Sequence, residues 1–433
     1  MPPLIRRFLT IVALVGGLYG LESGGFEWLI PDTAWRQLAL LAMVNVIAAL
    51  SLNIINGMAG QFSIGHAGFV GVGAYTAAVV SGNIHQSLGN EQILFGNSFI
   101  VVPLSLIAAG CAAALFGVVV GLPSLRLRGD YLAIVTLGFA EIFRLVIATA
   151  QTGGTAEGPI SRFLGSLGGQ NGYAGPTGTG LPQYAGPFWI FGAVIVATVI
   201  AWRIKFSGWG RTLRALREDE IAAAAVGVDP TRYKVTSFVI AAAGAGIAGG
   251  LLASMRDGPP TVSPDQFNFN ASFEAITMVI LGGSGSVSGA IVGGIFVTFT
   301  VKFIEYFQPA FQARFETLAE AVRPLSETLA DFLQKPDLNA LRMVVYAAVL
   351  ISLMIMRPEG LFGEREIFTR SRPKRPTGPA AAPPEPLVAT TAAEADARKG
   401  GDRELGPLVG SDAPAGEPRP GEDPGADKTE LDK

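Results

Sequence analysis

Few side chains in the long apolar runs of this sequence can carry charge, and these few are the first candidates for chemistry. Glu141 and Arg144 lie three residues apart in one run, a spacing at which a helix brings their charges together. An ionisable group inside a membrane span is costly unless it faces a partner or a polar cavity. We therefore predict that Glu141 and Arg144 neutralise each other rather than contact a substrate. Glu274, which opens a later apolar run, is a candidate for contact with water or with the ammonium group of a substrate.

The other reactive residue types do not form a catalytic or metal-binding group. His66 lies alone in a glycine-rich run, where hydrogen bonding and packing are favoured over proton transfer. The single cysteine, Cys111, lies inside an apolar run, which excludes a disulfide framework and a cysteine-based metal site. No G-x-x-x-x-G-K-[ST] motif occurs, so the chain does not bind ATP as a P-loop protein does. We predict no enzyme activity, no cofactor and, from a net charge of −3, no nucleic-acid binding.

Two glycine-rich breaks share one pattern. The stretch 57–63 reads G-M-A-G-Q-F-S, and 282–288 reads G-G-S-G-S-V-S. Matching breaks in two halves of a transporter indicate discontinuous helices near the membrane midplane, where freed backbone groups face a polar pathway. Close helix packing is the alternative, and it is favoured for any single glycine. The candidate pathway residues are Asn53, Gly57, Gly60, Gln61, Ser63, His66, Glu274, Gly282, Gly285 and Ser288.

A charged loop at 203–234 separates two apolar runs. Its stretch 211–225 contains good helix formers without Pro or Gly, so we predict one helix there, ended by a glycine. An apolar edge beside a charged edge suits docking in the groove of a partner protein. A helix on the bilayer surface is the alternative. The apolar edge is Leu213, Leu216 and Ile221. The residues assigned to docking are Arg214, Arg217, Glu218, Asp219, Glu220 and Gly227.

The elements that position these residues are membrane helices. Of the 433 residues, 49% are hydrophobic and only 15% are charged, and the mean hydropathy is +0.42, which excludes an ordinary soluble domain. Runs of about 20 apolar residues are long enough to cross a bilayer. The expected spans are 8–21, 38–55, 62–81, 99–122, 131–150, 188–202, 235–254 and 340–356, with 273–303 as two passes or a broken re-entrant pair. We read 8–21 as a retained helix rather than a signal peptide, because no cleavage pattern follows it.

The distribution of Lys and Arg orients the spans. The loop 203–234 is rich in both and is therefore expected in the cytoplasm, together with the N-terminus and the C-terminal tail. The glycine-rich stretch 151–187 and the acidic stretch 304–340 then lie outside. Residues 369–433 have the Pro-, Ala- and Gly-rich composition of a disordered tail. We predict an all-α polytopic membrane protein with about ten transmembrane or re-entrant helices in 1–368.

Several segments together resemble the LivM-type permeases of branched-chain amino-acid ABC importers. The resemblance covers about 38–363. The segments that carry it are 52–57 (L-N-I-I-N-G), 60–68 (G-Q-F-S-I-G-H-A-G), 125–139 (L-R-L-R-G-D-Y-L-A-I-V-T-L-G-F), 218–227 (E-D-E-I-A-A-A-A-V-G), 282–285 (G-G-S-G) and 357–362 (R-P-E-G-L-F). Two stretches depart from the family pattern: 307–336, which reads as an insertion, and the long tail.

The resemblance implies the inner membrane of a bacterium and a set of partners: a LivH-like second permease, two cytoplasmic ATPase subunits that use ATP and Mg, and a periplasmic amino-acid binding protein. It implies that 218–227 belongs to a coupling helix that inserts into an ATPase groove, and that 152–154 lies near the binding protein. Alternating access, driven by the ATPases, is the expected mechanism. A urea or short-amide importer is the nearest alternative. An ion-coupled secondary transporter is more remote, because the docking loop argues against it.

Overall fold

The computed structural model describes residues 3–87, 98–124, 131–150 and 158–322, with short pieces at 347–348, 351–352, 355–356, 360–363 and 366. Regular structure in these residues is helical, apart from isolated bridges between Tyr173 and Val262 and between Ala185 and Met255. This confirms the predicted all-α polytopic fold.

Six helices in the described part of the chain are long and apolar enough to cross a membrane. They agree with the predicted runs, except that the run expected at 62–81 begins as a helix only at residue 66. The six are α3 (Thr33–Asn53) with the π-helical turn Ile54–Met58 that follows it, α4 (His66–Ser87), α5 (Ser98–Ser124), α6 (Tyr131–Ala148), α8 (Pro187–Phe206) and α11 (Pro230–Ser254).

The predicted N-terminal helix is α1 (Pro3–Gly20), which continues through a π-helical turn (Leu21–Gly25) into α2 (Phe26–Leu29). Glu22 in this turn is buried and forms an ion pair with Arg256, and it accepts a hydrogen bond of 3.0 Å from the Phe188 N–H. The turn is therefore fastened to the beginning of α8 and to the segment after α11. That segment is bridged to Tyr173 through Val262, close to the 3₁₀ turn Gly169–Asn171, which contacts both α7 (Pro159–Ser166) and the 3₁₀ turn Pro264–Phe267.

The long segment predicted to be broken consists of two helices, α12 (Phe269–Gly282) and α13 (Val287–Val322). With 36 residues, α13 is about 54 Å long at 1.5 Å per residue, well beyond a hydrocarbon core of roughly 30 Å. The helix therefore continues into the stretch 304–340, where an inserted external segment was expected. The rest of that stretch, most of the predicted span 340–356 and the tail 369–433 lie outside the described residues.

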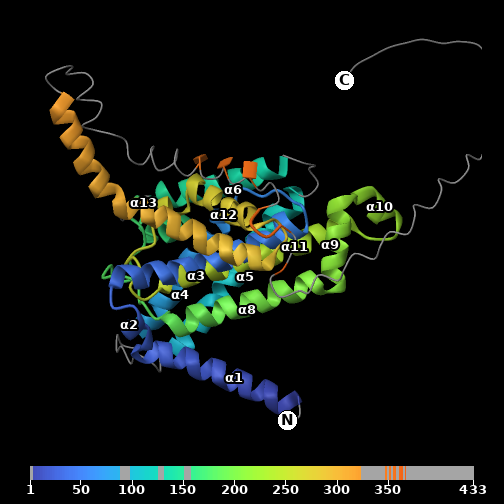
Figure 1. Ribbon diagram of the computed structural model, residues 1–433, viewed down its shortest axis with the longest axis horizontal. Helices are drawn as coiled ribbons and strands as arrows, with labels where there is room; N and C mark the ends of the chain where they lie inside the picture. The colour runs from blue at the N-terminus through green and yellow to red at the C-terminus, as the bar shows by residue number, and fades with distance from the viewer. Residues whose placement is uncertain are drawn as a thin grey trace, which may run out of the picture. The chain divides into compact units, whose positions relative to one another are not determined.

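Helix α11 lies in the middle of the bundle and packs against α3, α4 and α5 (Figure 1). Glycines make these contacts possible, because they let two backbones approach closely. A Cβ atom at Gly73 in α4 would overlap the backbone of Gly246 in α11, and one at Gly249 would overlap the Val70 carbonyl oxygen. Small residues thus fix the distance between the central helices.

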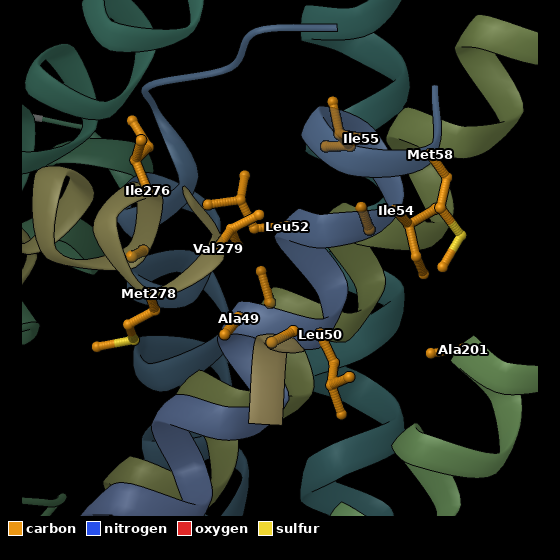
Figure 2. Close-up of a cluster of buried hydrophobic side chains, with 14 of the residues drawn as sticks. Ala49, Leu50, Leu52, Ile54, Ile55, Met58, Ala201, Ile276, Met278 and Val279 are labelled. Atoms are coloured by element: carbon orange, nitrogen blue, oxygen red, sulfur yellow. The ribbon is translucent and has the colours of Figure 1, made fainter. Parts of the chain in front are cut away.

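The end of α3 is surrounded by other helices. Figure 2 shows Leu52 beside Val279 of α12, while Ile54 and Met58 point toward α8, where Ala201 lies. These side chains are almost entirely buried. Burial of a Leu or Ile side chain contributes roughly 1.5–3 kcal/mol, so the core holds the π-helical turn firmly in place.

Two further helices, α9 (Gly208–Glu218) and α10 (Glu220–Ala225), connect α8 to α11. They lie at one end of both membrane helices, and α2 and the beginning of α3 lie at the other (Figure 1). The end that carries α9 and α10 is called the loop end below.

Candidate functional site: a junction of two glycine breaks

The two glycine breaks lie far apart in the sequence but meet at the loop end. Asn53, the last residue of α3, is fully buried and joins them. Its Oδ1 accepts a hydrogen bond of 2.8 Å from the Gly285 N–H, and its Nδ2 donates one of 3.0 Å to the Ser286 carbonyl oxygen. A Cβ atom at Gly57 would overlap the Gly285 nitrogen. One amide side chain therefore satisfies backbone groups that the second break leaves free.

Local backbone geometry explains why both breaks need glycine. Gly60 has a φ of +68°, and Gly283 and Gly285 have φ of +113° and +85°, a region that other L-residues rarely adopt. After Gly60 the chain runs without helical structure until α4 begins at residue 66. The second break is covered by the short piece 360–363, in which Leu361 and Phe362 donate hydrogen bonds to the carbonyl oxygens of Leu281 and Gly282. The breaks are thus built as a closed backbone junction.

The charged loop differs from its prediction in its secondary structure. The single helix expected over 211–225 is two helices, because Asp219 has extended backbone angles (φ −152°, ψ 109°) and caps the second. Its Oδ1 accepts hydrogen bonds of 2.9 and 3.0 Å from the N–H groups of Ile221 and Ala222. An aspartate at an N-cap stabilises the helix that follows it. Gly227, with a φ of +88°, follows the end of α10 as predicted.

The predicted apolar docking edge is wrong for two of its three members. Leu213 and Leu216 are 0% and 5% exposed, because they pack into the chain's own core. Ile221 is 79% exposed, and Val226 near the end of α10 is 81% exposed. The apolar surface that a partner protein could cover therefore lies on α10. Glu218, Asp219 and Glu220 are also exposed, and Glu220 forms an ion pair of 2.6 Å with Lys234.

Arg217 connects α9 to the junction. Its Nη1 donates a hydrogen bond of 2.8 Å to the Gly57 carbonyl oxygen, and its aliphatic stem lies where a Cβ atom at Gly60 would be. Arg214 points back toward α8 and donates to the Lys205 carbonyl oxygen at 3.4 Å. A continuous set of contacts thus runs from α9 through Arg217 and Gly57 to Asn53 and the second break.

The start of α13 is held by a buried carboxylate that sequence reasoning missed. The Glu366 side chain is 2% exposed and pairs with Lys205 of α8, with 2.5 Å between Oε1 and Nζ. It also accepts hydrogen bonds from the Val287 N–H (2.7 Å), the Ser288 N–H (3.0 Å) and the Ser288 hydroxyl (2.6 Å). A carboxylate at a helix N-terminus satisfies free N–H groups and interacts favourably with the helix dipole. Ser288, a predicted pathway residue, therefore lies in an anchoring cluster.

We expect this cluster to make the fold sensitive to acid. Burial raises the pKa of the Glu366 carboxyl, but the hydrogen bonds from Lys205, Ser288 and Val287 outweigh it, so the pKa lies below its usual range. Such a group stabilises the fold above its unfolded pKa, about 4.3 for Glu, and this contribution is lost as the pH falls through the lower folded pKa. Thermal unfolding of the purified chain between about pH 6 and pH 3 should therefore show a steeper loss of stability than in Glu366→Gln. Parallel curves for the two proteins would contradict the assignment.

The polar residues Gln61, Ser63 and His66, in the first break and just after it, are buried. His66 Nε2 lies 2.9 Å from the Ser51 hydroxyl oxygen, and the Ser63 backbone exchanges hydrogen bonds with the Asn56 side chain. The side-chain amide of Gln61, the hydroxyl of Ser63 and Nδ1 of His66 are buried and have no hydrogen-bond partner among the described residues. Unsatisfied buried polar groups are rare in folded proteins and call for an explanation.

Glu274 lies away from the junction. It lines a cleft of about 470 Å³ toward the end of the bundle opposite α9 and α10. The cavity at the junction itself, beside Gly57, Gly285 and Arg217, has a volume of only about 20 Å³. The predicted pathway residues thus form two groups: Glu274 in an open cleft, and the glycine breaks in a closed junction. The predicted pairing of Glu141 with Arg144 is confirmed, with 3.0 Å between Arg144 Nε and Glu141 Oε1.

Comparison with known proteins places this arrangement in a family. The family model described as "Branched-chain amino acid transport system / permease component" matches residues 35–354. The chain belongs to this family. Both glycine breaks, α9 and α10 lie inside the matched region. This permease is a multi-pass membrane protein, as its six span-length helices indicate.

Curated relatives support the assignment of the permease. It is 32% identical over 341 residues to the "High-affinity branched-chain amino acid transport system permease protein LivM" of Salmonella typhimurium, covering 75% of this chain and 69% of that protein. The same identity and coverage are found with LivM of Escherichia coli. The LivH permease protein of Escherichia coli is 36% identical over 106 residues, 24% of this chain and 32% of LivH. No solved structure matches the permease at a significant level.

Proposed function

We propose that the permease forms one half of the membrane pathway of an ABC importer that moves leucine, isoleucine and valine into the cytoplasm. Membership of the permease family supports the role, and the contact of Arg217 with Gly57 gives it a mechanism. That contact joins a loop outside the membrane helices to a break inside them. A loop of this kind can carry the motion of a partner into the bundle.

The partners supply the energy in this proposal. A second, LivH-like permease completes the pathway, two cytoplasmic ATPase subunits bind and hydrolyse ATP with Mg, and a periplasmic binding protein delivers the amino acid. The permease itself binds no cofactor and catalyses no reaction. It lies in the inner membrane of a bacterium with both termini in the cytoplasm, which puts the loop end beside the ATPases.

Motion reaches the pathway in three steps. The ATPases close on ATP and move α10, whose exposed Ile221 and Val226 form the docking surface. Helix α9 directly precedes α10 and moves with it. The buried leucines of α9 pass this motion to the bundle, and Arg217 passes it to the first break. Asn53 transmits the shift to the second break. The pathway then opens on one side of the membrane and closes on the other.

Uptake in proteoliposomes tests the proposal. The permease is reconstituted with its cognate permease, ATPases and binding protein, and uptake of labelled leucine and of labelled urea is measured with and without ATP. We expect ATP-dependent leucine uptake that excess valine or isoleucine suppresses. Urea uptake without leucine uptake would keep the importer architecture and refute the substrate. Leucine uptake without ATP or ATPases would indicate a secondary transporter.

A further inference from the structure

We propose that the cleft around Glu274 is the outer amino-acid site of the permease and that it recognises both charges of the substrate. Helices α3, α11, α12 and α13 and the segment after α11 contribute its walls, together with Ala67 and Val70 near the start of α4. Its volume of about 470 Å³ falls in the range of small-ligand sites, about 300–1,000 Å³. This inference rests on the proposed function, because it assigns a site to the same transport.

Charges of both signs line the cleft. Glu274 on α12 contributes a carboxylate, and Lys302 on α13 contributes an ammonium group. A free α-amino acid is a zwitterion, so its ammonium group can pair with Glu274 while its carboxylate pairs with Lys302. Asp265, which forms an ion pair of 3.4 Å with Arg144, adds a second carboxylate to the lining of the cleft. The amides that add hydrogen-bonding groups are those of Gln37, Asn45, Gln266, Asn268 and Asn270.

The rest of the wall is apolar and suits a branched side chain. Leu41, Val44, Leu252 and Met278 line the same cleft. Urea has neither charged groups nor an apolar part, so this combination favours an amino acid over urea. A larger groove of about 730 Å³ between α1, α5 and α8 has one polar side chain, Ser51, among its lining residues and offers no charge to a zwitterion.

The segment 59–65 connects the junction to the cleft along the chain. This segment runs from the π-helical turn at the junction to the first turn of α4, where the Ala67 N–H donates to the Ser272 hydroxyl at 3.4 Å. Its buried groups without hydrogen-bond partners, on Gln61, Ser63 and His66, lie along the way. Such groups destabilise a conformation in which they stay buried. They become useful when the segment moves and presents them to a passing polar substrate.

Variants of the two charged residues test the inference in the complete importer. Initial leucine uptake is measured with saturating leucine-loaded binding protein, alongside ATP hydrolysis. We expect Glu274→Gln and Lys302→Met each to lower uptake at least tenfold and to change ATP hydrolysis less than twofold. Glu274→Asp keeps the charge and should retain at least a third of wild-type uptake. Glu27→Gln and Arg162→Met, which change exposed residues elsewhere, are the matched controls and should transport normally.

Thiol labelling gives a second readout that does not depend on transport rate. Cys111 is the single cysteine, so Cys111→Ala with Asn270→Cys places one thiol in the cleft. Leucine-loaded binding protein should slow its reaction with a membrane-impermeant thiol reagent, and Glu274→Gln should abolish the protection.

The outcomes separate the two proposals. A wild-type complex that takes up no leucine refutes the proposed function. If the wild-type complex transports leucine but Glu274→Gln and Lys302→Met behave like the controls, the assignment of the cleft is overturned and the proposed function stands. The same holds if leucine does not protect the thiol at residue 270.

Discussion

Replacing Glu366 with alanine is expected to destabilise the permease by about 3–5 kcal/mol, the usual cost of removing one partner from a buried ion pair. The variant leaves Lys205 buried without this carboxylate and removes the acceptor from the N–H groups of Val287 and Ser288. Thermal unfolding in detergent measures the effect. Glu27→Ala, which removes an exposed carboxylate, should change the melting temperature little.

A double variant separates the two contributions of Glu366. Replacing a buried ion pair as a whole by apolar side chains is often neutral, so Lys205→Met with Glu366→Leu should recover part of the lost stability. The N-terminal N–H groups of α13 remain without the carboxylate, so recovery should stay incomplete. A Glu366→Ala variant as stable as the wild type would show that the cluster does not anchor α13.

Replacing Asn53 with leucine is expected to abolish transport. The change leaves the Gly285 N–H and the Ser286 carbonyl oxygen buried without their present partner, and each such group costs roughly 1–3 kcal/mol. It also removes the link between the two breaks. ATP-dependent leucine uptake should fall at least tenfold, and the leucine moved per ATP hydrolysed should fall with it.

Asn83→Leu is the matched control, because Asn83 is an exposed asparagine on α4. Assembly of the complex is checked by co-purification of the partner subunits. An Asn53→Leu complex that assembles and transports like this control would refute the role of the junction in coupling.

Patterns in the sequence predicted the helices well, because apolar runs and helix breakers act locally. The paired glycine motifs marked two breaks that lie together in the structure, but they could not show that the second break packs onto Gly57 through Asn53. That contact joins positions 232 residues apart. The motif therefore suggested an open pathway where the structure has a closed junction.

Two predictions for the charged loop were wrong, one for a local reason and one for a tertiary reason. The stretch 211–225 favours a helix on average, yet Asp219 prefers to cap one, since its carboxylate can accept from the next turn. A heuristic that looks for Asp before an alanine-rich run could have found this break. The burial of Leu213 and Leu216 was inaccessible to the same reasoning, because an amphipathic pattern does not say which surface covers it.

Glu366 gave no local signal at all. Its partner Lys205 lies 161 residues earlier, and the family motif at 357–362 ends before it. From sequence alone, a glutamate shortly after the last predicted span looks like an ordinary surface residue. Its role depends on the meeting of α8 and α13, which only the fold provides.

The contact between Glu366 and the start of α13 can form only late in the synthesis of the chain. A ribosome delivers the chain from its N-terminus, so α8 and α13 are synthesised before residue 366 exists. The helix end at Val287 and Ser288 receives its acceptor only after residue 366 has been made. A nascent permease that stalls early therefore lacks one of the contacts that complete its bundle.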